Sequence, residues 1–188
     1  MILVGTDVGL FRSTDGGLSY SLVNDANLNG KRVWSLARTG VNTWIVSVET
    51  NYGNAASSGN LYRSTNGTSW TAISPDLSGG AGGGSSGQVY GTITTIAVSP
   101  LDGNVIWCGT DDGHVQVTTN GGTNWSDVSL TLPDRWITSV RTDPTDRENA
   151  CVTISGFRWG SPLPHVYRTT NLGASWSAIA GNLPEAPA

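Results

Sequence analysis

The chain has 188 residues and a formal net charge of −4 at pH 7, and it is rich in glycine, with 25 residues, and in tryptophan, with 8. The negative charge gives no reason to expect nucleic acid or an anionic membrane surface as a partner. No apolar run is long enough to cross a bilayer, and no long stretch has the 3.6-residue periodicity of a helix.

Short apolar stretches separated by turn residues follow one another along the whole chain, which is typical of antiparallel strands. The first expected strand covers residues 2–6 and leads directly into a turn at 7–9, so no signal peptide is expected there. Further strands are expected at residues 32–37, 43–48, 92–98, 105–109, 136–140 and 150–154. Each of these pairs, and the first strand, is followed by a hairpin.

The hairpins contain one sequence that occurs four times, at residues 13–20, 64–70, 118–125 and 169–176, which we call the box turns. The copies begin 51, 54 and 51 residues apart, and such a period indicates a repeat architecture. Hydroxyl, Asn and Asp side chains can bind turn amides, glycine takes a positive φ, and the aromatic residue anchors the next strand. We expect these members to be structural: Ser13, Asp15, Gly17, Tyr20, Ser64, Asn66, Trp70, Thr118, Asn120, Gly122, Trp125, Thr169, Asn171, Gly173 and Trp176.

The box turns resemble the Asp-box (BNR) repeat, Ser/Thr-x-Asp-x-Gly-x-Thr/Ser-Trp, although three copies carry Asn for Asp. That repeat is known from β-propellers of the sialidase, xyloglucanase and sortilin types. The resemblance implies an all-β propeller of four-stranded antiparallel blades, whose strands we call A to D in chain order. About four blades are expected, at residues 1–29, 30–78, 88–132 and 133–183.

The first blade of this scheme begins at strand B and therefore lacks its inner strand A. Residues 183–188 are too short and too rich in proline to supply that strand. A closed four-bladed ring, an eight-bladed ring of two chains and a piece of a larger ring all remain open. We expect the partner to be another propeller half, either a second copy or the rest of a longer chain.

The box turns are C–D connections, and in a propeller they share one end of the blades with the A–B turns. The B–C and D–A connections lie at the opposite end, which we call the loop face, and they include a Gly/Ser tract at residues 79–87 that is expected to be flexible.

A glycoside hydrolase needs two carboxyl groups across the bond that it cleaves. Carboxylates are expected on the loop face at Asp7, Glu49, Asp76, Asp111 and Asp112. The candidates for catalysis are Asp76, Asp111 and Asp112, although Asp in such turns is also an ordinary hairpin signal.

Candidate ligand-binding residues also come from the connections of the loop face. Aromatic rings can stack on sugars or anchor a protein partner. His114 and His165 each stand four residues before a box turn, with no third ligand at a metal-like spacing. The candidates for ligand binding are Tyr52, Tyr90, Arg158, Trp159, His114 and His165. No metal and no cofactor is expected.

Two functions are therefore open. The first is a non-catalytic propeller module that binds a protein or a glycan on its loop face, and the second is a glycoside hydrolase of the xyloglucanase type. A surface rich in Ser, Thr, Asn and Gly is expected for an extracellular protein. The two cysteines, Cys108 and Cys151, align to different positions of the repeat, so we expect free thiols rather than a disulfide.

Overall fold

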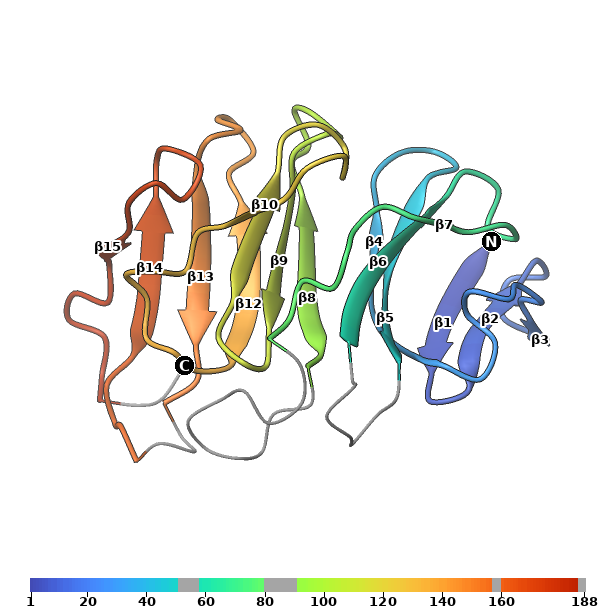
Figure 1. Ribbon diagram of the computed structural model, residues 1–188, viewed down its shortest axis with the longest axis horizontal. Helices are drawn as coiled ribbons and strands as arrows, with labels where there is room; N and C mark the ends of the chain where they lie inside the picture. The colour runs from blue at the N-terminus through green and yellow to red at the C-terminus, as the bar shows by residue number, and fades with distance from the viewer. Residues whose placement is uncertain (51–57, 80–90, 157–159, 186–188) are drawn as a thin grey trace.

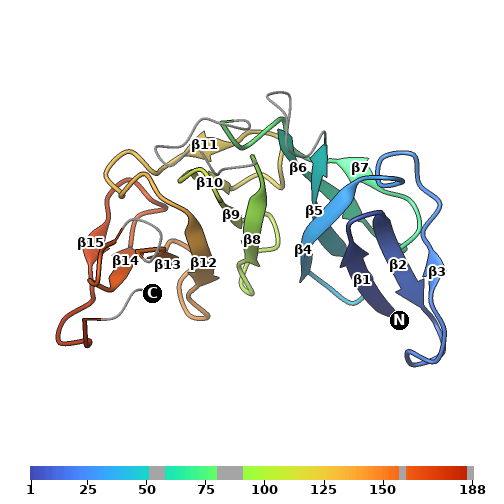
Figure 2. The same ribbon diagram turned by 90° about the horizontal axis from the view of Figure 1, so that it is seen from below.

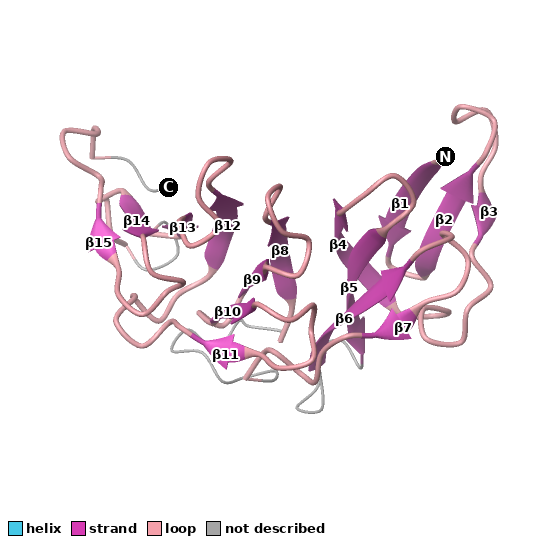
Figure 3. Ribbon diagram, turned by 90° about the horizontal axis from the view of Figure 1, so that it is seen from above, coloured by secondary structure: helices cyan, strands magenta, loops and turns pink. Residues whose placement is uncertain are grey.

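The computed structural model describes residues 1–50, 58–79, 91–156 and 160–185, and within these ranges the secondary structure consists of strands (Figure 3). The strands form four antiparallel sheets, each a simple meander in chain order. Among the described residues there is no helix long and apolar enough to cross a membrane. The all-β architecture predicted from the alternating pattern is thus confirmed.

Each sheet is one blade. Blade 1 has three strands: β1 (Ile2–Thr6), β2 (Gly9–Ser13) and β3 (Ser21–Leu22). Blade 2 has four: β4 (Arg32–Arg38), β5 (Trp44–Thr50), β6 (Ser58–Ser64) and β7 (Thr71–Ala72). Blade 3 has β8 (Ile93–Val98), β9 (Ile106–Thr110), β10 (Val115–Thr118) and β11 (Ser126–Asp127). Blade 4 has β12 (Ile137–Thr142), β13 (Ala150–Ile154), β14 (His165–Thr169) and β15 (Ser177–Ala178).

The blades stand side by side along an open arc (Figures 1 and 2). Strands β4, β8 and β12 are the A strands, and neighbouring blades meet through β1 and β4, β4 and β8, and β8 and β12. Among the described residues, the sheet of blade 1 has the order β1-β2-β3 and β1 pairs with the C strand, so this part of the chain supplies blade 1 with no A strand, as expected. The N-terminus and the end of the described chain lie at opposite ends of the arc (Figure 2).

The hydrophobic core is divided into three layers, one between each pair of adjacent blades. Leu10 and Leu28 of blade 1 pack with Val46 and Val48 of blade 2. The layer between blades 2 and 3 contains Ile45, Leu61, Leu77, Ile106 and Cys108. The layer between blades 3 and 4 contains Trp107, Val115, Val117, Val152 and Ile154. Because both faces of the central blades are covered, every residue of β9 is buried.

The four box turns have the same hydrogen bonds. In each turn a hydroxyl oxygen accepts a glycine amide: Gly17 to Ser13 at 2.8 Å, Gly67 to Ser64 at 2.8 Å, Gly122 to Thr118 at 3.0 Å and Gly173 to Thr169 at 2.9 Å. The same hydroxyl donates to the Asp or Asn side chain two residues later. In the first turn, hydrogen bonds from the Ser19 hydroxyl and backbone amide, and from Ser13, hold the pKa of Asp15 well below its usual range.

The box turns lie at the same end of the blades as the A–B turns. The Gly121 amide donates to the Asn104 carbonyl at 3.0 Å, and the Leu172 amide donates to the Glu148 carbonyl at 2.9 Å. The loop face is therefore at the opposite end, as the strand order requires.

Both cysteines are free: Cys108 is buried between blades 2 and 3, and Cys151 is half-buried in β13.

Candidate ligand-binding site

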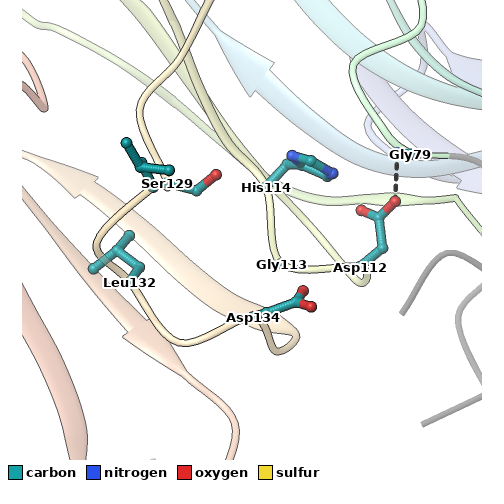
Figure 4. A pocket seen from close by; sticks show the side chains of 8 residues that line it. Gly79, Asp112, Gly113, His114, Ser129, Leu132 and Asp134 are labelled. Atoms are coloured by element: carbon teal, nitrogen blue, oxygen red, sulfur yellow. Dashed lines mark hydrogen bonds between the residues drawn. The ribbon is translucent and has the colours of Figure 1, made fainter. Parts of the chain in front are cut away.

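A pocket of about 330 Å³ opens on the loop face beside blade 3 (Figure 4). It forms between the B–C turn of blade 3, the D–A connection that follows β11, and Gly79 in the first half of the D–A connection that follows β7. Its lining residues are Gly79, Asp112, Gly113, His114, Ser129, Leu130, Leu132 and Asp134. The pocket lining thus combines two carboxylates, one imidazole and two leucine side chains.

The B–C turn is fixed in place by backbone contacts that follow directly from its sequence. Asp111 is 1% exposed, its Oδ1 accepts the Thr92 amide at 2.7 Å, and its own amide donates to the Thr92 carbonyl at 3.0 Å. Gly113 has a φ of +95°, and a Cβ there would lie 2.7 Å from Asp134 Oδ1. Glycine is therefore required if the turn and Asp134 are to approach each other so closely.

Asp112 is buried at the edge of the pocket, with 5% of its surface exposed. Its Oδ2 accepts the Gly79 amide at 2.5 Å, which is the dashed line in Figure 4. Within the described part of the chain, no hydrogen-bond donor reaches its other carboxylate oxygen, Oδ1. A buried carboxylate oxygen without a donor is energetically costly, and a donor supplied by a ligand would remove that cost.

His114 is oriented by Asp127 of β11. His114 Nδ1 lies 2.5 Å from Asp127 Oδ2, and this hydrogen bond raises the pKa of His114, with smaller contributions from the charges of Asp112, Asp127 and Asp134. Burial opposes ionisation of Asp127, but hydrogen bonds from His114 and Ser129 outweigh it and lower the pKa of Asp127 to about 2. The other ring nitrogen, Nε2, lies on the Gly79 side, where a Cβ on Gly79 would approach within 3.2 Å.

Asp127 and Asp134 were not among the sequence candidates. Asp127 lies in the strand that follows a box turn, where an alternating residue is expected to face solvent. The hairpin register could have indicated Asp127. Gln116 pairs with Asp127, and His114 lies two residues before Gln116 on the same face of the strand, so its side chain is within reach of Asp127. Asp134 follows Pro133 in an irregular connection, and the sequence pattern there contains no comparable signal.

The remaining carboxylate candidates lie apart from the pocket. Asp76 is exposed, and its Oδ1 accepts the Gly59 amide at 2.9 Å and the Ser78 amide at 3.0 Å. Glu49 is 2% exposed and accepts the Trp34 indole N–H at 2.7 Å. Of the three candidates for catalysis, only Asp112 lines the pocket; Asp76 and Asp111 bind backbone amides.

His165 occupies the same position in the repeat as His114 but has different partners. Its Nε2 lies 3.0 Å from Ser161 Oγ and 3.1 Å from Arg135 Nη1. Burial, and then the charge of Arg135, lower the pKa of His165. The other candidates for ligand binding, Tyr52, Tyr90, Arg158 and Trp159, lie outside the described residues. Within the described ranges, no three His, Cys, Asp or Glu side chains are grouped so as to hold a metal ion.

No protein-family model matches the chain, and no curated protein matches it. Solved structures do. A GH74 xyloglucanase from Xanthomonas campestris has a TM-score of 0.68 at 18% identity, over 97% of this chain and 29% of that one. A GH74 enzyme from Niastella koreensis has a TM-score of 0.65 at 18% identity, over 91% of this chain and 27% of that one. YCF48 bound to D1 peptide has a TM-score of 0.53 at 16% identity, over 78% of this chain and 39% of that one.

This chain spans less than a third of the length of the two GH74 enzymes. At such identities the likeness concerns the fold and not the activity. Together with the four antiparallel sheets on an arc, it shows that the chain has the fold of part of a β-propeller.

Proposed function

We propose that this chain is a non-catalytic propeller segment of the Asp-box type that binds a partner protein through a basic side chain. The observation that carries this proposal is the pocket on the loop face, in which the carboxylates of Asp112 and Asp134 lie around His114. We also propose an extracellular location, whether the segment assembles with a second copy or with further blades, on the basis of its Ser-, Thr-, Asn- and Gly-rich sequence.

The charges around the pocket favour a cation. Asp112 and Asp134 line the pocket together with His114, and Asp127 is hydrogen-bonded to the His114 ring, so three carboxylates lie near a single imidazole. Figure 4 shows the Asp112 and Asp134 carboxylates on the same side of the pocket. An ammonium or guanidinium group carries several N–H donors. Asp134 is exposed and would accept from it directly, whereas the buried, unpartnered Oδ1 of Asp112 would be reached only after the pocket rim moves.

The apolar part of the lining fits the stem of the same side chain. The half-buried Leu132 offers an apolar wall to the methylene groups of Lys or Arg, and the 97% exposed Leu130 also lines the pocket. The described lining residues include no Trp, Tyr or Phe ring on which a sugar could stack. A basic peptide therefore fits this site better than a glycan does. One of the similar structures is YCF48 bound to D1 peptide, which supports peptide binding as a function that this fold can carry.

Glycoside hydrolysis is the second candidate, because two GH74 enzymes share the fold and two carboxylates line one pocket. Hydrolysis needs one carboxyl group as acid and another as base or nucleophile, roughly 5–10 Å apart across an open groove. Asp112 is buried and already accepts a backbone amide, so it is poorly placed to attack or to protonate a sugar. Binding without hydrolysis is therefore the preferred function.

The proposal is tested with Nα-acetyl-lysine methylamide and Nα-acetyl-arginine methylamide as probes, and Nα-acetyl-norleucine methylamide as the uncharged control. We expect the basic probes to shift the amide resonances of Gly79, Gly113 and Ser129, and to do so less at high salt. Asp134→Asn should abolish these shifts, whereas Asp7→Asn, which removes a carboxylate elsewhere on the same face, should not. Equal shifts with the norleucine probe would overturn the proposal. Release of reducing ends from xyloglucan, lost in Asp112→Asn, would favour the hydrolase instead.

A further inference from the structure

Blades 2 and 3, and blades 3 and 4, are joined by a hydrogen bond that the box aromatic makes with the preceding blade. The Trp125 indole N–H donates to the Ile73 carbonyl at 2.9 Å, and the Trp176 indole N–H donates to the Val128 carbonyl at 2.8 Å. Ile73 and Val128 hold equivalent positions, because each directly follows the outer strand of its blade, β7 or β11. The same hydrogen bond therefore occurs at the interfaces of blades 2 with 3 and 3 with 4.

The box glycine takes part in the same contact. A Cβ on Gly122 would lie 2.4 Å from the Ile73 carbonyl oxygen, and a Cβ on Gly173 would lie 2.6 Å from Val128 Cβ. Both glycines also have positive φ values. The box turn therefore has no side chain at this point. The residue that follows the outer strand of the preceding blade packs directly against the glycine backbone.

The box turn of blade 1 has the same glycine surface, but within the described residues no residue of another blade packs against it. Gly17 and Tyr20 hold the positions of Gly122 and Trp125, and the closest atoms to a Cβ on Gly17 belong to blade 1 itself, Tyr20 Oη at 3.3 Å and Ile2 Cδ1 at 3.4 Å. Tyr20 is 45% exposed. The box turn of blade 1 is therefore open to a residue from a further blade.

The sheet face beside that turn is apolar and exposed. Val4 pairs with Phe11, and together with Thr6 and Tyr20 they line an apolar hollow of about 260 Å³. The equivalent pair of blade 2, Val46 and Tyr62, is buried against blade 1. The equivalent pair of blade 4, Val152 and Tyr167, packs in the layer against blade 3. This face of a blade is thus built to be covered by a preceding blade.

The opposite end of the arc offers the complementary surface. Ile179 directly follows β15, as Ile73 follows β7 and Val128 follows β11. Its amide donates to the Val166 carbonyl at 2.9 Å, as the amides of Ile73 and Val128 donate to the carbonyls of Leu61 and Val115. Ile179 is 46% exposed. Ile179 of blade 4 is therefore the exposed equivalent of the residue that packs against the box turn of a following blade.

We propose that blade 4 of one copy of this chain docks on blade 1 of a second copy, with Ile179 seated on Gly17 and Tyr20. The second copy is the occupant that already carries the matching surface, since the same two surfaces meet inside each copy. Because the two surfaces lie at opposite ends of the arc, two copies joined at both ends form a closed head-to-tail dimer (Figure 2).

The test is sedimentation of the wild-type chain and of Tyr20→Asp, Ile179→Asp and Val41→Asp, each at several concentrations. The three substituted side chains are exposed, so the variants should fold, and a thermal melt verifies this. We expect the wild type to sediment at twice 19.6 kDa, with a dissociation constant in the micromolar range or tighter. Tyr20→Asp and Ile179→Asp should each weaken the dimer at least tenfold, whereas the control Val41→Asp, in a distant A–B turn, should not.

Mixing the two interface variants separates head-to-tail docking from other dimers. A mixture of Tyr20→Asp and Ile179→Asp restores one intact interface per dimer, so it should associate more tightly than either variant alone. A dimer that Ile179→Asp leaves unchanged would overturn the proposal, because blade 1 would then pair with blade 1. A wild-type chain that stays monomeric at about 1 mM would also overturn it, and further blades would then be the occupant.

Discussion

At the scale of single residues, the two histidines show that an equal position in the repeat does not give an equal environment. His114 donates its Nδ1–H to the Asp127 carboxylate, whereas His165 lies beside Arg135. The hydrogen bond to Asp127 raises the pKa of His114, and burial together with Arg135 lowers the pKa of His165. Two copies of the same repeat therefore hold histidines whose pKa values are shifted in opposite directions.

We predict that NMR titration of the two imidazoles gives a higher midpoint for His114 than for His165. Since folding raises the pKa of His114, its charge stabilises the fold fully below the unfolded value of about 6.5 and ceases to do so as pH rises through the folded pKa. Asp127→Asn should lower the His114 midpoint and leave that of His165 unchanged. A His114 midpoint at or below that of His165 would contradict the geometry of the pair.

The box tryptophan of blade 4 is predicted to be a structural anchor. Its indole donates to Val128, and its ring meets that of the fully buried Trp107 edge to face, with centroids 6.1 Å apart. Trp176→Ala should therefore lower the free energy of unfolding by about 3 kcal/mol. Chemical denaturation measures this, with Val41→Ala, at a 79% exposed side chain, as the control expected to stay within about 0.5 kcal/mol of wild type. An equal effect of both substitutions would rule out the anchor.

At the scale of elements, the box turn is held by its first hydroxyl. Thr118 is 2% exposed, and its Oγ1 accepts the Gly122 amide at 3.0 Å while donating to Asn120 Oδ1 at 2.9 Å. We predict that Thr118→Val, which keeps the shape and removes the hydroxyl, costs about 1–3 kcal/mol of unfolding free energy, because a turn amide loses its partner. The matched control is Thr119→Val, at the exposed neighbouring threonine, which should cost much less in the same denaturation experiment.

The outer strands and the box aromatics show which features of the fold a local sequence pattern does not predict. The period of the box turns predicts the hairpins well, because the turn chemistry is local. The outer strands are only two residues long, and each begins after the box aromatic rather than with it, as in β11 at Ser126. In blades 3 and 4 the tryptophan ring donates instead to a carbonyl of the preceding blade. For Trp125 and Ile73 this contact joins residues 52 positions apart, which no local sequence pattern contains.

At the scale of the whole molecule, the fold could be predicted from the sequence and the site only in part. The repeat indicates four blades and places the box turns away from the loop face. It selects Asp112 and His114 for the loop face, and both line the pocket. It does not indicate Asp127 or Asp134, since their approach to His114 depends on the hairpin register and on an irregular connection. The layers between blades likewise depend on packing over long sequence separations.

The layered core leads to a prediction about how the molecule opens. Cys108 is fully buried between blades 2 and 3, and burial raises the pKa of its thiol, so the native chain should not react with a thiol reagent at this position. Reaction requires blades 2 and 3 to separate. That separation removes the central layer of a quasi-linear array and leaves two pairs of blades, each with a newly exposed apolar face.

We therefore predict that Cys108 is labelled only through global unfolding. The measurement uses the Cys151→Ser variant, which leaves Cys108 as the single thiol, at one fixed protein concentration. The opening free energy from its labelling rate should agree within about 1 kcal/mol with the unfolding free energy from denaturation, because separation of blades 2 and 3 exposes an apolar face on each blade pair and is expected to unfold both pairs. Labelling that is much faster than global unfolding would mean that the blade pairs open independently, and the core would then be cooperative within the pairs rather than across the arc.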